Sequence, residues 1–270
     1  MKTTITPDQI QQYRNQGYLL YPGLLDSEEM AKLKSAVLET VAQMGKKKAA
    51  GLDWEAGDSS YYDKVFTQRL NLWKLNETVK SFMLSPKLGK LLCQLEGVEG
   101  FRVWHDQALI KEPFGNPTGW HLDNPYWSFH SRHSISIWIA LEDATPFNGC
   151  MYFAPGSQKL ANFDNISIGE DLGGLFKVYP KMGEIDTVPV PMKAGDCSFH
   201  NGLTAHGAGA NMTRGRRVAM TSGYMPEGST FNGTKNILPE PYFSSLKVGD
   251  ILENDDQNPI VYSSKKLAKA

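Results

Sequence analysis

The chain has 270 residues, 41% of them hydrophobic and 21% charged, which suits a globular protein with a sizeable core. Its 28 Lys and Arg residues nearly balance its 29 Asp and Glu residues, so neither nucleic acid nor an anionic membrane is expected as a partner. Three well-separated cysteines, and the lack of an apolar run as long as a signal peptide or a membrane span, predict a cytoplasmic protein with reduced thiols.

The first hundred residues predict helices. Residues 6–9 combine a capping threonine, a proline suited to a first helical turn and a glutamine that can close a capping box. A short strand should follow at 18–21. Apolar residues then recur three and four positions apart, which predicts a second helix from 26–27 and another from Ser85.

Residues 49–66 are irregular and rich in aromatic side chains. A long loop of this kind often covers a site, so Trp54, Tyr61 and Tyr62 are candidate substrate contacts, although a packed surface connection fits the same residues. The lysines at 46–48 just before it could hold a phosphate, but a solvated run of charge is the better interpretation.

From Phe101 onward, short runs of β-forming residues alternate with Gly, Pro and Asn, which indicates an all-β sandwich or barrel. The clearest strands are 101–111, 134–141 and 217–225. In the second of these, the isoleucines fall on one face and the serines and Trp138 on the other.

The simplest organisation is a single domain. Residues 1–97 would form a mostly helical flank with a loop, 98–240 the β core, and 241–270 a C-terminal extension.

A histidine and an aspartate stand two residues apart in the segment 118–127. Because successive side chains alternate in an extended chain, His121 and Asp123 should point the same way. With one more histidine they would form the two-histidine, one-carboxylate arrangement that binds non-haem iron and leaves positions open. For the pair alone, a surface histidine beside a turn aspartate is the better interpretation.

A third ligand is available in the glycine-rich segment 195–211, where His206 lies in a bend that lets the backbone approach a metal. Arg217 follows 11 residues later on the next predicted strand. Its planar guanidinium suits the carboxylate of a substrate or cosubstrate, although Arg214 and Arg216 are further cations and a surface salt bridge is the alternative role.

The other histidines have simpler interpretations. His200 could be the metal ligand in place of His206, but a packed or hydrogen-bonded core position suits its predicted strand better. Solvent or loop positions are expected for His130 and His133, and a structural role for His105.

Together these motifs resemble the phytanoyl-CoA dioxygenase family of iron- and 2-oxoglutarate-dependent oxygenases. The resemblance covers almost the whole chain, in the order Thr6-Pro7-Asp8-Gln9, Gly17-Tyr18, Trp120-His121-Leu122-Asp123, Trp138-Ile139-Ala140-Leu141-Glu142-Asp143, Asn148-Gly149, Pro155-Gly156-Ser157, Gly195-Asp196, His206-Gly207, Asn211 and Arg217. It implies a double-stranded β-helix (a cupin-like jelly roll) with flanking helices. It also implies Fe(II) on His121, Asp123 and His206, and the distal carboxylate of 2-oxoglutarate on Arg217.

The resemblance also places Gln107 and Trp138 near the cosubstrate. Many family members carry a serine two residues after the distal histidine, where it helps to hold the cosubstrate, but this chain has Ala208. The missing hydrogen bond would then come from elsewhere, with Thr221 and Ser136 as candidates.

The implied activity is the O₂-dependent oxidation of a C–H bond, most simply hydroxylation, with release of succinate and CO₂. We expect a small, mostly apolar metabolite, as in secondary metabolism, covered by the loop 51–66. Tyr126 and Trp127 would wall the pocket, or else be ordinary core aromatics. The alternatives are a cupin-like metalloprotein of another chemistry, which would not need Arg217, and a non-catalytic member of the fold.

Overall fold

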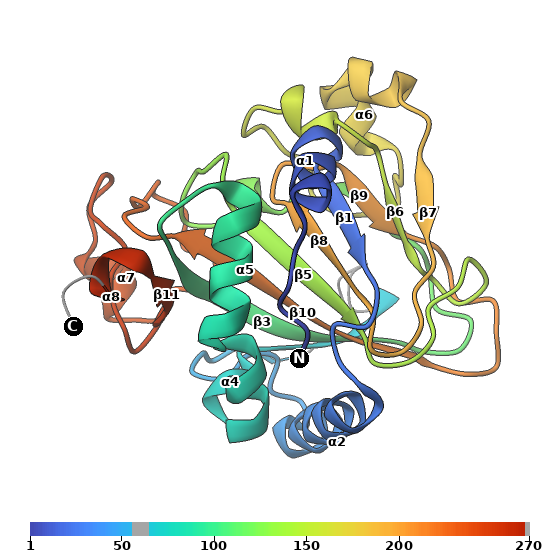
Figure 1. The fold of residues 1–270 in the computed structure, drawn as a ribbon, viewed down its shortest axis with the longest axis horizontal. Helices are drawn as coiled ribbons and strands as arrows, with labels where there is room; N and C mark the ends of the chain where they lie inside the picture. The colour runs from blue at the N-terminus through green and yellow to red at the C-terminus, as the bar shows by residue number, and fades with distance from the viewer. Residues whose placement is uncertain (56–64, 268–270) are drawn as a thin grey trace.

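Two antiparallel sheets form the centre of the molecule, which a computed structural model describes at residues 1–55 and 65–267 (Figure 1). The larger sheet has the order β1-β8-β5-β10-β3-β11, with β2 also pairing to β3, and the smaller has the order β4-β9-β6-β7. The strands are β1 (Tyr18–Tyr21), β2 (Thr67–Leu70), β3 (Gly100–Lys111), β4 (Thr118–His121), β5 (Ile135–Ala140), β6 (Met151–Phe153), β7 (Val188–Val190), β8 (Cys197–Asn201), β9 (His206–Ala208), β10 (Arg217–Pro226) and β11 (Ile260–Ser263). The mainly β core with N-terminal helices is therefore confirmed.

Helices cover one face of the larger sheet: α5 lies in front of the strands in Figure 1, and α4 and α2 lie below it. Their apolar residues pack against the isoleucines of β5 in one buried cluster, as the alternation in that strand predicts. The α-helices are α1 (Pro7–Gln16), α2 (Ser27–Met44), α4 (Glu77–Met83), α5 (Pro86–Glu96), α6 (Gly174–Val178), α7 (Tyr242–Ser245) and α8 (Ser264–Leu267), and the 3₁₀ turns are η1 (Leu72–Lys74), η2 (Asn124–Tyr126), η3 (Ser157–Lys159) and η4 (Pro180–Glu184).

Local capping signals account for the starts of the first two long helices. Thr6 and Gln9 form the expected capping box, and α1 ends at Gly17 with a φ of 78°, a conformation that glycine adopts without strain. Asp26 and Glu29 form a second capping box at α2.

The other face of the larger sheet turns toward the smaller sheet, and strand register orders its side chains in transverse rows. One row is His105–Gly223–Ser136–His200, and the next is Gln107–Thr221–Trp138–Ser198. Rows that share a face lie two residues apart along each strand, or roughly 7 Å. This face carries polar residues that line the site, among them Gln107, Ser136, His200 and Thr221.

Some secondary-structure elements are not predicted from the sequence. The strand β2 pairs with β3 directly after the stretch expected to be irregular, and the strands of the smaller sheet are too short for a clear alternation. β11, from the expected C-terminal extension, also pairs with β3. Because both ends of the chain contribute strands to one sheet, we propose that the described residues form a single domain.

Candidate metal centre and its cavity

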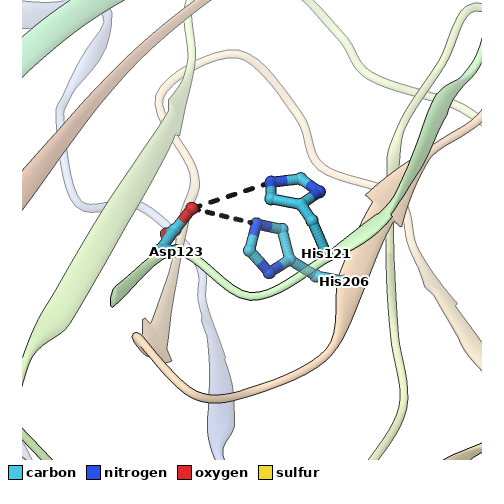
Figure 2. Close-up of side chains that lie close together, drawn as sticks. All are labelled: His121, Asp123 and His206. Carbon is cyan, nitrogen blue, oxygen red and sulfur yellow. Dashed lines mark ion pairs between the residues drawn. The ribbon is translucent and has the colours of Figure 1, made fainter. Parts of the chain in front are cut away.

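His121, Asp123 and His206 converge between the sheets (Figure 2). Strand pairing sets the two histidines opposite each other on β4 and β9. Oδ1 of Asp123 lies 3.7 Å from Nε2 of His121 and 3.6 Å from Nε2 of His206, and both imidazoles are buried. One ligand atom from each of the three residues lies within 4.8 Å of the others, which is close enough for one metal ion.

Backbone carbonyls fix the orientation of both imidazoles. Nδ1 of His121 lies 2.9 Å from the oxygen of Gly119, and Nδ1 of His206 lies 2.9 Å from the oxygen of Thr204. Because a carbonyl only accepts, each Nδ1 carries the proton and each Nε2 presents its lone pair to the centre. Burial lowers the pKa of His121 and lowers that of His206 well below its ordinary value, so both rings are neutral near pH 7.

The carboxylate of Asp123 is held through its other oxygen. Oδ2 accepts a hydrogen bond of 2.6 Å from Oγ of Ser136 and lies 3.1 Å from Nε2 of His200. Burial raises the pKa of Asp123, but the neighbouring histidines His206, His200 and His121 lower it by more, so the carboxyl is ionised. His200 is thus the buried, hydrogen-bonded residue that was expected.

A cavity of about 600 Å³ opens beside these residues. Arg217 lines it and is fully buried, with its guanidinium 5.1 Å from the ring centre of Trp138 and 5.6 Å from that of Phe66. Arg214 and Arg216 are exposed. Arg217 is therefore the arginine of this triplet that a carboxylate in the cavity can meet.

The residues expected near the cosubstrate also line the cavity. Gln107, Trp138 and Thr221 share one transverse row, and Ser136 lies in the next. Oγ of Ser136 donates its single proton to Asp123, so it has none left for a cosubstrate carboxylate. Thr221 is thus the better of the two hydroxyl candidates.

Thr118 is a cavity residue that the sequence analysis missed. It pairs with Ala208 across β4 and β9, is 7% exposed, and its Oγ1 has no hydrogen-bond partner within the described residues. Opposite residues in a sheet bring their Cβ atoms to about 5 Å, so the Cβ of Thr118 lies close to that of Ala208, where many relatives are expected to carry a serine. No local sequence pattern signals this pairing.

The structure places His105 and Lys48 at the cavity, which the sequence does not predict for either residue. His105 was expected to be structural, but it lines the cavity. Of the three lysines, Lys46 and Lys47 are exposed as expected, whereas Lys48 is half-buried at the cavity.

The candidate substrate contacts divide into two groups. Tyr126, Trp127 and Trp54 line the cavity, and Trp127 also packs in an apolar cluster. Tyr61 and Tyr62, with most of the expected lid, lie outside the described residues.

The donor set fits iron and 2-oxoglutarate. Two neutral imidazoles and one ionised carboxylate are the protein ligands of non-haem Fe(II) sites, and they leave coordination positions free for a chelating 2-oxo acid. A buried guanidinium in the same cavity matches its second carboxylate. Among the described residues, no helix is long and apolar enough to cross a membrane.

Comparisons with known proteins agree with this chemistry. Residues 13–219 match the sequence model of the family "Phytanoyl-CoA dioxygenase (PhyH)". The chain is 27% identical over 234 residues to a "Probable alpha-ketoglutarate-dependent hypophosphite dioxygenase" from Stutzerimonas stutzeri, covering 80% of this chain and 77% of the relative. Its fold resembles that of the non-heme alpha ketoglutarate dependent carbocyclase SnoK from nogalamycin biosynthesis, with a TM-score of 0.79, 28% identity and coverage of 95% and 96%. The epimerase SnoN in complex with Fe3+, alpha ketoglutarate and nogalamycin RO gives a TM-score of 0.78, 26% identity and coverage of 94% and 97%.

Proposed function

The chain belongs to the phytanoyl-CoA dioxygenase family of non-haem iron, 2-oxoglutarate-dependent dioxygenases, and from this premise we propose that it hydroxylates a C–H bond of a small, mostly apolar metabolite. This proposal rests on the observation that His121, Asp123 and His206 share one cavity with the buried Arg217. Bound iron with 2-oxoglutarate and O₂ supplies the oxidising power, and the cosubstrate leaves as succinate and CO₂.

In this proposal, His121, Asp123 and His206 hold Fe(II). Their contacts support that role, because each imidazole is fixed by a backbone carbonyl and the carboxylate by Ser136 and His200. Ligands held in this way need little rearrangement when the metal binds.

Arg217 then binds the distal carboxylate of 2-oxoglutarate. A charge-assisted, two-pronged contact of this kind fixes both the position and the orientation of the cosubstrate. We propose that Thr118 supplies the hydroxyl absent at Ala208, that Thr221 adds a second, and that Gln107 and Trp138 wall the same part of the cavity.

The substrate occupies the remainder of the cavity. Its walls include Trp127 and Tyr126 after Asp123, Trp54 from the 51–66 segment, and Ile168 and Ile237. Pockets of this kind bind apolar molecules and orient them with a few polar groups. Trp54 and Phe66, from the described part of the 51–66 segment, line the cavity, which supports a covering role for that part.

The test is succinate release with Fe(II), 2-oxoglutarate and a panel of metabolites, followed by mass analysis of the product. Succinate formation coupled to a product heavier by one oxygen atom would support hydroxylation. Iron loading without any turnover of 2-oxoglutarate would favour the alternative, a cupin-like protein that binds metal for another purpose.

A further inference from the structure

His105 is a buried polar residue of the cavity to which the proposed function gives no role. It lies on β3, is 7% exposed, and its Nδ1 makes no hydrogen bond to another of the described residues. Nδ1 is closed off from the cavity, so Nε2 is the ring nitrogen that a ligand in the cavity could meet.

The position of His105 is set by the same rows that order the metal centre. β3 and β10 pair it with Gly223, and β10 and β5 pair Gly223 with Ser136, the residue that holds Asp123. A Cβ on Gly223 would come within 2.7 Å of Cζ2 of Trp127, so only glycine lets this indole lie against the strand. The indole meets the imidazole edge-on, at 6.0 Å between ring centres and 85° between planes. Trp127 and His105 therefore form one wall of the cavity.

The imidazole of His105 is neutral. Burial lowers its pKa to about 4, although the charge of Asp123 acts in the opposite direction. A neutral imidazole has one N–H donor and one acceptor nitrogen, which suits a hydroxyl or a carbonyl. It has no charge with which to attract an oxyanion.

The cavity has few positively charged side chains. Among the described lining residues, the lysines and arginines are Arg217 and Lys48. Arg217 pairs with a residue six positions along β3 from His105, or roughly 20 Å away. Lys48 is accompanied on its own segment by the carboxylates of Asp53 and Glu55.

We propose that Trp127 and His105 form the substrate subsite, in which the indole packs against the carbon skeleton and the imidazole hydrogen-bonds a neutral oxygen. The substrate is then an uncharged, oxygenated carbon compound that carries a hydroxyl or a carbonyl near the oxidised carbon. It differs in charge from hypophosphite, the compound named for one relative. This inference rests on the proposed function.

The test uses the enzyme loaded with Fe(II) and 2-oxoglutarate without oxygen. Cyclohexanol, cyclohexanone, methylcyclohexane and hypophosphite are titrated as probes, and binding is followed by the change in the charge-transfer absorbance of the iron–2-oxoglutarate complex. We expect the two oxygenated rings to bind about three- to ten-fold more tightly than methylcyclohexane, the range of one neutral hydrogen bond.

In His105→Phe this preference should disappear, because phenylalanine keeps the contact with Trp127 but cannot form a hydrogen bond. His105→Gln should retain part of it, and His130→Phe, on an exposed residue, should match the wild type. The proposal is wrong if cyclohexanol binds no better than methylcyclohexane, if His105→Phe keeps the preference, or if hypophosphite binds most tightly.

A failure of this proposal can be distinguished from a failure of the proposed function. Binding of Fe(II) and 2-oxoglutarate is measured first in every variant, and it also reports that the variant is folded. Wild-type protein that binds neither would contradict the proposed function itself.

Discussion

Ser136 donates a hydrogen bond of 2.6 Å to Oδ2 of Asp123, and this contact leaves Oδ1 facing the imidazoles of His121 and His206. Ser136 lies on β5 of the larger sheet, and Asp123 follows β4 of the smaller sheet. The larger sheet therefore fixes the position of this carboxylate.

Removing a hydrogen-bonding partner of Asp123, either Ser136 or His200, should weaken metal binding without removing a metal ligand. Loss of a hydrogen-bonding partner behind a metal ligand typically costs about 10- to 100-fold in affinity, so we expect Ser136→Ala and His200→Phe to fall in that range. Ser198→Ala is the matched control, because Ser198 is an equally buried serine in the neighbouring row. Titration with Fe(II) measures the effect, and equal affinities of Ser136→Ala and Ser198→Ala would show that the contact is not needed.

Asp123→Ala should remove a proposed ligand outright. We expect loss of bound iron after purification and loss of all coupled succinate formation, because two imidazoles alone hold the metal weakly. Iron content and succinate release are measured together. Wild-type succinate production by this variant would refute the ligand assignment.

Arg217→Ala should weaken 2-oxoglutarate binding. A charge-assisted pair contributes about 1.5–3 kcal/mol net, which corresponds to roughly a ten- to a hundred-fold change in the dissociation constant. Arg217→Lys should recover only part of it, since lysine has the charge but not the planar fork. The exposed Arg216 supplies the control, and a loss in Arg216→Ala with normal binding in Arg217→Ala would reverse the assignment.

Thr118→Val keeps the shape of the side chain and removes its hydroxyl. If Thr118 replaces the serine missing at Ala208, the variant should bind 2-oxoglutarate about three- to ten-fold more weakly, and Thr118→Ser should bind nearly as the wild type does. The double variant Thr118→Val, Ala208→Ser should regain affinity. Unchanged binding in Thr118→Val would argue that another group, such as Thr221, holds the cosubstrate.

The stability of the metal-free protein should depend on His105. Its pKa is about 4 in the folded protein and about 6.5 when unfolded, so the unfolded state binds the extra proton as the pH falls below about 6.5. Stability is therefore lost over the window from about pH 6.5 to 4. Between pH 7 and pH 5, the wild type should lose about 2 kcal/mol more of its unfolding free energy than His105→Phe does. Urea unfolding at both pH values measures this, and equal losses would show that the imidazole is not buried in neutral form.

Local sequence patterns determined much of the secondary structure. The capping residues Thr6 and Asp26 fixed the starts of two helices, because a cap acts on backbone groups within one turn of itself. The alternating isoleucines of 135–139 identified a strand and its buried face, because successive side chains of a strand point in opposite directions. The spacing of His121 and Asp123, with the order of the later motifs, pointed to the metal centre, although Asp123 lies just beyond the end of β4 and not on the strand.

Only the tertiary structure decided which side chains meet across strands. Thr118 faces Ala208, His105 joins Gly223, and Ser136 reaches Asp123 because strand register brings together residues far apart in sequence. Register depends on the packing of whole sheets, and a shift of one residue would turn every one of these side chains to the opposite face. No local pattern carries that information, so the hydroxyl of Thr118, the wall formed by His105, and the place of Lys48 at the cavity emerged only from the folded chain.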